Sequence, residues 1–106
     1  MSNGGMNKMM KQLQKAQAEM GRMQDTIAAK TVEATSGGGA VRVVASGTKS
    51  LISLKIDPEA ISEDNREMLE DMIVAAVNEA FRRVDDLVAE EMQRLTGGLN
   101  LPPGMF

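Results

Sequence analysis

The stretch TVEATSGGGAVRVVASGTKSLISLKIDP, residues 31–58, decides the fold of this chain. Apolar side chains recur at every second position in two of its parts, first Val41, Val43 and Ala45, then Ile52, Leu54 and Ile56. A period of two is typical of a β-strand with one buried face. The stretch therefore predicts an antiparallel meander of three strands, over residues 31–36, 40–46 and 50–56.

Turn residues separate these strands. The triplet Gly37–Gly39 marks the first turn, and Gly47-Thr48 predicts a two-residue hairpin whose first central position needs a positive φ. Asp57-Pro58 ends the sheet. The glycine triplet lacks the G-x-x-x-x-G-K-[ST] pattern of a phosphate loop and leads into a strand, so we interpret it as a turn.

Upstream of the meander, the apolar period lengthens to that of a helix from Met6 to about Ala29. The apolar residues alternate spacings of three and four, which is the seam of a heptad repeat: Met6, Met9, Leu13, Ala16, Met20, Met23 and Ile27. We expect residues 1–5 to be a flexible end.

A second helix is predicted downstream, capped by Ser62 or Asp64 and running to about Leu95. Gly97-Gly98 supplies its stop, and residues 97–106 are expected to be flexible. The order α-β-β-β-α defines an α+β fold, with residues 1–106 forming a single domain.

The predicted helices are too long for one short sheet to cover. About 32 residues make a second helix of about 48 Å, whereas a compact domain of this size has a radius of gyration of about 13 Å. Its apolar band therefore needs a partner, and a twofold homodimer is the economical solution. The alternative is a monomer in which the two helices pack only on each other. Asn78 lies inside this band, where a hydrogen bond across the dimer or to a backbone group is favoured over base recognition.

Composition excludes most catalytic chemistry. The chain has no Cys and no His, so a thiolate nucleophile, a Cys/His zinc site and a histidine acid or base are all ruled out. We expect no enzyme, no cofactor and no small-molecule substrate. The N-terminus lacks the apolar core of a signal peptide, and no apolar run reaches membrane-spanning length, so a cytoplasmic protein is expected.

Charge is distributed unevenly along the chain. Its net charge is −3, yet residues 1–55 hold eight Lys/Arg against three Asp/Glu, and residues 56–106 hold four against twelve. On a helical wheel, four cations of the first helix fall within an arc of about 60°, nearly opposite the apolar seam. We call this set the cationic ridge: Lys8, Lys11, Lys15 and Arg22.

Three interpretations of the cationic ridge stay open from the pattern alone. It is a solvated polar face, a surface for the phosphates of duplex DNA, or a membrane-binding face, which normally carries aromatic and leucine side chains on its apolar side. Helical spacing lets Lys15 pair with Glu19 and Arg22 with Asp25. In the second helix the same spacing pairs the arginines with carboxylates: Glu79 with Arg82 and Arg83, Arg82 with Asp86, and Glu90 with Arg94.

The acidic residues near the start of the second helix are able to hold Mg²⁺ weakly, but a solvated acidic face that complements the helix dipole explains them better. They are Glu63, Asp64, Glu67, Glu70 and Asp71.

The sequence resembles the YbaB/EbfC family of bacterial nucleoid-associated proteins over essentially its whole length. The matching stretches are Met10–Gln17, Met20, Met23-Gln24, Val41-x-Val43, Gly47, Ile56–Pro58, Glu67–Met72, Ala75–Ala80 and Gly98-x-x-Leu101–Gly104. The resemblance implies a tweezer-like homodimer that binds DNA at the nucleoid, alters its conformation and influences gene expression. It also implies DNA contacts by helical arms, but no family motif assigns the contacts to the cationic ridge, which follows from helix geometry alone.

Two hypotheses follow. The first is a non-enzymatic homodimer that binds double-stranded DNA through the cationic ridge. The second is a protein-interaction adaptor whose Met-rich helix faces clasp a partner. Salt distinguishes them, because phosphate binding weakens steeply as salt rises and apolar contacts do not.

Overall fold

A computed structural model describes residues 3–98 as two long helices and a three-stranded antiparallel sheet. Helix α1 (Asn3–Ala29) leads into β1 (Thr31–Ser36), β2 (Val41–Ser46) and β3 (Leu51–Ile56), and α2 (Arg66–Gly98) follows. The strands lie in the order β1-β2-β3. This is the α+β arrangement that the sequence predicts, with β2 and β3 each beginning one residue later and α1 beginning three residues earlier than expected.

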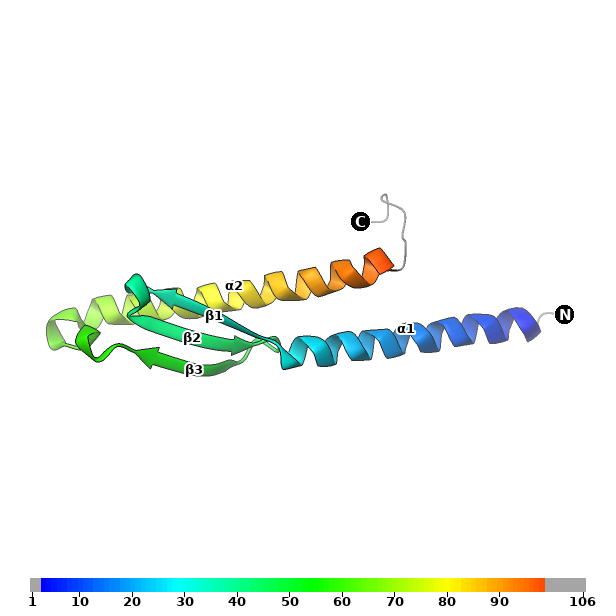
Figure 1. Ribbon diagram of the computed structural model, residues 1–106, viewed down its shortest axis with the longest axis horizontal. Helices are drawn as coiled ribbons and strands as arrows, with labels where there is room; N and C mark the ends of the chain where they lie inside the picture. Colours follow the sequence, from blue (N-terminus) through cyan, green and yellow to red (C-terminus); the bar gives the residue numbers. More distant parts are fainter. Residues whose placement is uncertain (1–2, 99–106) are drawn as a thin grey trace.

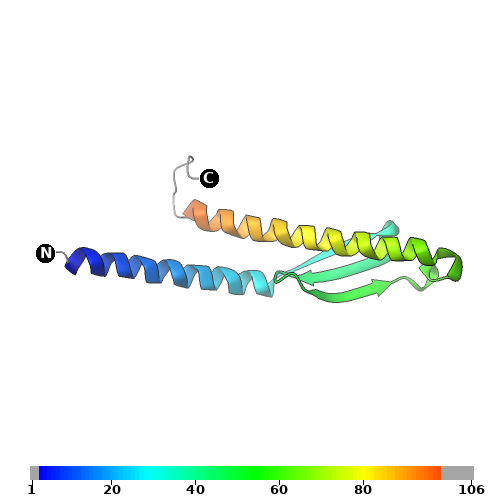
Figure 2. The same ribbon diagram turned by 180° about the vertical axis from the view of Figure 1, so that it is seen from behind.

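The molecule is elongated. It measures 78 × 26 × 16 Å, and its radius of gyration is 20.9 Å, well above the value of about 13 Å for a compact chain of this length. Figures 1 and 2 show the reason: α1 projects from one end of the sheet, and α2 runs along the whole sheet and extends past that same end beside the base of α1. The chain thus divides into a body, formed by α2 and the sheet, and an arm, formed by α1.

The core lies between α2 and the first two strands. Val41, Val43 and Ala45 of β2 are fully buried, as their alternation predicts. They pack with Ala34 of β1 against one face of α2, whose contribution is Ala76, Ala80 and Val84. Small alanines at the contact let the helix approach the sheet closely.

Strand β3 continues the face of the sheet that α2 buries, but α2 does not cover β3 itself. In the register, Val43 lies opposite Leu54. Yet Ile52 is 58% exposed and Leu54 39% exposed, because α2 lies over β1 and β2 and leaves β3 to one side. An apolar strip is therefore open to solvent along this edge of the body.

The turn between β1 and β2 is formed by Gly37–Gly39, as predicted, and is closed by a hydrogen bond from the backbone N–H of Ala40 to the carbonyl oxygen of Gly37. All three glycines have positive φ, which side-chain-bearing residues rarely adopt. Gly37 also packs on α2, since a Cβ there would lie 2.1 Å from the sulfur of Met72. Ser36 beside it donates a hydrogen bond to the backbone carbonyl of Met72.

The β2–β3 hairpin differs from the sequence expectation. The positive φ of 64° belongs to Lys49 and not to Gly47, and the pairing register shifts between Val44 and Ala45. The loop is therefore longer than two residues, with a left-handed residue before β3, a common hairpin form. Gly47 is needed for another reason, which is its contact with α1.

Helix α2 begins after two short 3-10 turns, Pro58–Ala60 and Glu63–Asn65. The Ser62 hydroxyl accepts a hydrogen bond from the backbone N–H of Asn65, so of the two expected caps Ser62 is the one used. The helix reaches Gly98, three residues beyond the predicted end. The rest of the expected C-terminal flexible segment lies outside the described residues.

None of the helices within residues 3–98 is long and apolar enough to cross a membrane.

Candidate nucleic-acid interface

The arm exposes most of its apolar seam. Ile27, at its base, is 7% exposed and packs on the body, whereas Met6, Met9 and Leu13 are each about 60% exposed. The seam falls on one side of the helix because its residues repeat every seven positions. Within residues 3–98, only the last turns of the seam are covered by another element.

The cationic ridge lies on the arm, on a different face from the seam. All four of its residues are exposed: Lys8, Lys11, Lys15 and Arg22. Within residues 3–98 none of them forms an ion pair at 4.0 Å or less. The helical pairs Lys15–Glu19 and Arg22–Asp25, which the spacing allows, are therefore absent. Exposed pairs of this kind gain little energy against the loss of side-chain freedom.

The root of the arm is held by an ion cluster. Lys30, just after α1, donates a hydrogen bond to Glu91 of α2, and Arg94 contacts the same carboxylate oxygen at 3.2 Å. Glu91 is only 8% exposed. The hydrogen bond from Lys30, with the charge of Arg94, lowers the pKa of the Glu91 carboxyl below its ordinary value. The predicted Glu90–Arg94 pair was wrong, because Arg94 turns toward the carboxylate that already faces Lys30.

Gly47 forms the second attachment of the arm. Its backbone N–H donates a hydrogen bond of 3.0 Å to the carbonyl oxygen of Lys30. A Cβ on Gly47 would lie 1.9 Å from the carbonyl oxygen of Ile27, so no side chain fits. The hairpin turn therefore presses directly on the last turn of α1.

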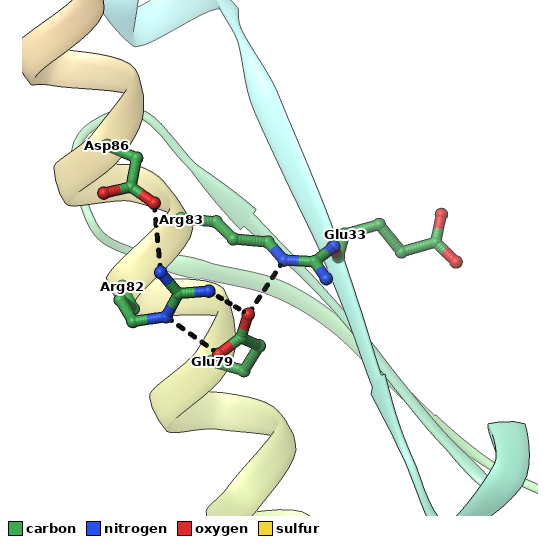
Figure 3. Close-up of polar contacts among 5 residues, drawn as sticks. All are labelled: Glu33, Glu79, Arg82, Arg83 and Asp86. Carbon is green, nitrogen blue, oxygen red and sulfur yellow. Dashed lines mark hydrogen bonds and ion pairs between the residues drawn. The ribbon is translucent and has the colours of Figure 1, made fainter.

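The arginines in the middle of α2 are bound to neighbouring carboxylates, as predicted (Figure 3). Glu79 accepts hydrogen bonds from both Arg82 and Arg83, and Arg82 also reaches Asp86 at 3.2 Å. The hydrogen bonds from Arg82 and then Arg83 lower the pKa of Glu79 to about 2. These guanidinium groups are consequently less available to an external anion than the cations of the arm.

Arg83 has a further structural role. Its guanidinium donates a hydrogen bond to the backbone carbonyl of Glu33 in the edge strand β1 (Figure 3). Edge strands carry unpaired backbone groups that invite pairing with other chains. Arg83 thus satisfies one of these groups and ties β1 to α2.

Other candidate residues of the sequence do not gather into a site. Within the described chain, no group of three or more Asp or Glu residues is placed to hold a metal ion, and the acidic start of α2 is solvated. Asn78 is exposed on α2 and makes no side-chain hydrogen bond within residues 3–98. Its expected role across a dimer stays a prediction.

Sequence reasoning missed the residues that attach the arm. Lys30 and Glu91 are 61 positions apart, so no local periodicity connects them. The sequence predicted Gly47 as a turn residue, but it did not predict that Gly47 packs against Ile27. The only hint for Glu91 was a carboxylate on the apolar side of α2.

Cations on an exposed helical arm, in a chain that is acidic overall, define an α-β-β-β-α protein suited to contact a polyanion. Comparison with known proteins is consistent with that class. Residues 2–99 match the YbaB/EbfC DNA-binding family. The chain belongs to the YbaB/EbfC DNA-binding family.

Its relatives are similar over their full length. A protein of Pelotomaculum thermopropionicum is 52% identical over 106 residues, and one of Desulforamulus reducens is 54% identical over 106 residues; all of this chain and all of each relative are covered. Both carry the name nucleoid-associated protein. A crystal structure of an uncharacterized protein from Helicobacter pylori has the same fold. It aligns with a TM-score of 0.61 at 22% identity, covering 82% of this chain and 96% of that one.

Proposed function

We propose that this protein is a non-enzymatic, nucleoid-associated protein that binds duplex DNA as a homodimer and alters its conformation. The phosphate contacts come from the cationic ridge: Lys8, Lys11, Lys15 and Arg22. The observation that carries the proposal is that these four cations are exposed on a projecting helix and have no ion-pair partner within the described chain. Membership of a DNA-binding family supports the proposal, and so do the names of the relatives, which are called nucleoid-associated proteins.

Free cations suit phosphate binding because each one neutralises a phosphate and releases a condensed counterion. Salt-bridged arginines, such as Arg82, must first give up their carboxylate partners. The arm also carries no aromatic residue on which single-stranded bases can stack, which favours duplex over single-stranded DNA.

The proposed dimer covers the apolar strip of the body. Ile52 and Leu54 of β3 are exposed beside α2, and Val74 of α2 is 58% exposed. In a twofold dimer the same surface of both protomers meets, so the apolar strip of one protomer packs on that of its partner. Asn78, exposed on the same helix, is then available for a hydrogen bond across the interface.

Dimerisation gives the DNA contact its geometry. Two arms held at a fixed separation present about eight ridge cations to one duplex or to two. A duplex that contacts both arms must follow their spacing and direction, and bending it costs about 1–6 kcal/mol, which added phosphate contacts repay. Residues 1–106 form a single binding domain in this proposal, located at the nucleoid in the cytoplasm.

The test is fluorescence anisotropy of a labelled duplex at a series of salt concentrations. The triple variant Lys8→Gln, Lys11→Gln, Lys15→Gln is compared with Gln14→Glu, Gln17→Glu, Gln24→Glu, which lies on other faces of the same helix. Each triple lowers the net charge by three, and both proteins are first checked to be folded and of the same oligomeric state as wild type.

We expect the lysine variant to bind duplex DNA more weakly and to flatten the log–log salt slope by about 0.9 for each phosphate that is no longer neutralised. The control variant Gln14→Glu, Gln17→Glu, Gln24→Glu changes the affinity less and keeps the salt slope of wild type. Equal reductions of affinity in both variants show that only net charge matters and remove the ridge as the site. Absence of duplex binding by wild type at low salt refutes the proposed function.

A second candidate is favoured by the exposed seam of the arm. Met6 and Met9 of the seam are each more than half exposed, and methionine is common at adaptable binding surfaces. In that case the protein is an adaptor that clasps a partner protein. Its binding would be nearly indifferent to salt, which the same titration with a candidate partner would show.

A further inference from the structure

The sheet has a second face that no described element covers. Helix α2 covers one face of the sheet (Figures 1 and 2). Val41 and Val43 of β2 pack on that side, and the alternate residues of β2 point to the other side. Arg42 is one of them and is 61% exposed. The outer face is therefore an open surface of the body, separate from the apolar strip beside α2.

Two cations lie directly opposite each other on this face. Arg42 of β2 is the register partner of Lys55 in β3. Directly opposed side chains in an antiparallel pair have Cβ atoms about 4.5–5.5 Å apart, and like charges there destabilise the sheet. Glu33 forms an ion pair with only one of the two cations, Arg42, whereas an anion placed between the two cations would make both favourable.

Neutralisation within the chain is incomplete. Arg42 approaches the carboxylate of Glu33 at 3.6 Å, which is too long for a hydrogen bond. Lys55 forms no ion pair within residues 3–98. Asp57 lies near Lys55, but its carboxylate accepts a hydrogen bond from the backbone N–H of Glu59 and caps the following 3-10 turn.

Depressions flank the cation pair on both sides. One, of about 280 Å³, extends from Arg42 and Lys55 to Gly39 and Asp57 at the end of the sheet. The other, of about 190 Å³, extends along the strands to Val44 and Ser53; both cations line it, and so does Glu33, the carboxylate beside Arg42. Gly39 has a φ of 94° and no side chain, so it leaves the approach to the Arg42 guanidinium open.

We propose that Arg42 and Lys55, beside the glycine turn, form a phosphate-binding site on the outer face of the sheet, and that a backbone phosphate of duplex DNA occupies it. The assignment of DNA as the source of the phosphate rests on the proposed function. Arg42 pairs with Thr35, near the end of β1 that is farther from the arm. The site thus extends the DNA contact from the arm to the opposite end of the body.

The site is tested first with inorganic phosphate, independently of DNA. Two-dimensional amide NMR of the full-length protein is recorded during titration with phosphate, with chloride held at matched ionic strength as the control. We expect shifts concentrated at residues 38–43 and 54–57 that disappear in the double variant Arg42→Gln, Lys55→Gln. Shifts spread evenly over all surface lysines, or unchanged in the variant, overturn the site.

Duplex binding then tests the source of the phosphate. The variant Arg42→Gln, Lys55→Gln is compared by anisotropy with Lys49→Gln, Arg82→Gln, which removes the same charge from cations that are hydrogen-bonded to carboxylates, Asp85 and Glu79. We expect the site variant to weaken binding several-fold and to reduce the salt slope by about 0.9 for each protomer, because one phosphate contact is lost from each. The control variant changes both much less.

The outcomes separate this inference from the proposed function. If wild type binds DNA and the two variants behave alike, the outer face is not a DNA contact, and the function proposed for the arm is unaffected. If wild type does not bind DNA at all, the proposed function fails and the DNA assignment fails with it. Localised phosphate shifts in that case show a site for a free phosphate group.

Discussion

The body and the arm are built from the same kinds of residue but differ in what covers them. In the body, α2 and the first two strands bury Val41, Val43 and Val84 almost completely. In the arm, Met6 and Leu13 repeat as regularly and stay about 60% exposed. Apolar periodicity therefore predicts the shape of an element but not whether this chain supplies its partner, and the uncovered element carries the four exposed cations of the ridge.

The same substitution at two glycines gives the largest expected difference between body and arm. Gly47→Ala places a Cβ 1.9 Å from the Ile27 carbonyl oxygen, so we expect the free energy of unfolding to fall by about 3 kcal/mol. Gly21→Ala, in the arm, meets nothing within 4 Å and should gain about 0.5–1 kcal/mol from helix propensity. Urea unfolding followed by circular dichroism measures both, and a neutral Gly47→Ala contradicts the close attachment of the arm.

Truncation of apolar side chains gives the next largest difference. Val43→Ala removes a fully buried side chain and should cost about 2 kcal/mol, from the lost transfer energy and the cavity left behind. Leu13→Ala, on a side chain that is 58% exposed, should cost less than about 0.5 kcal/mol. If chemical denaturation shows equal costs, the arm is covered in solution by another chain or segment.

A third experiment disturbs the connection between the two regions. Glu91→Gln removes the charge that holds Lys30 and Arg94, and we expect the arm to sample a wider range of angles. Spin labels on the arm and on the middle of α2 report this as a broader distance distribution by pulsed electron paramagnetic resonance. Glu90→Gln, the adjacent exposed residue, is the matched control and should leave the distribution unchanged.

The smallest effect is expected from pH, through the ion pairs of the body. Because the pKa of Glu79 is lowered to about 2 from 4.5, its contribution to stability is present above pH 4.5 and is lost as the pH falls toward 2. The difference in Tm between wild type and Glu79→Gln should therefore shrink over that interval. A difference that stays constant down to pH 2 would show that the carboxylate contributes through packing and not through its charge.

Much of the fold could be predicted from local sequence, for a physical reason. The alternation Val41-x-Val43-x-Ala45 needs a strand to bury one face, and the heptad from Met6 to Ile27 needs a helix. The hairpin between β2 and β3 was predicted too short, because turn propensities place a positive φ at glycine. The structure instead places it at Lys49 and reserves Gly47 for contact with α1.

Only part of the candidate interface could be predicted from local sequence. Helical geometry alone places Lys8 and Lys11 on one face, so the cationic ridge followed from spacing. The Arg42–Lys55 pair depends on strand register, and the Lys30–Glu91 contact joins residues 61 positions apart. Such juxtapositions arise from tertiary packing, which no single stretch of sequence encodes.

The attachment of α1 has a mechanical consequence. The helix has 27 residues and acts as a lever of about 40 Å whose fulcrum is the contact of Gly47, Lys30 and Glu91. A rotation of about 10° at this fulcrum moves the far tip by about 7 Å, which exceeds the width of about 6 Å of the DNA minor groove. In the DNA contact proposed for the arm, a small rotation at this attachment would therefore move the tip by about the width of one groove.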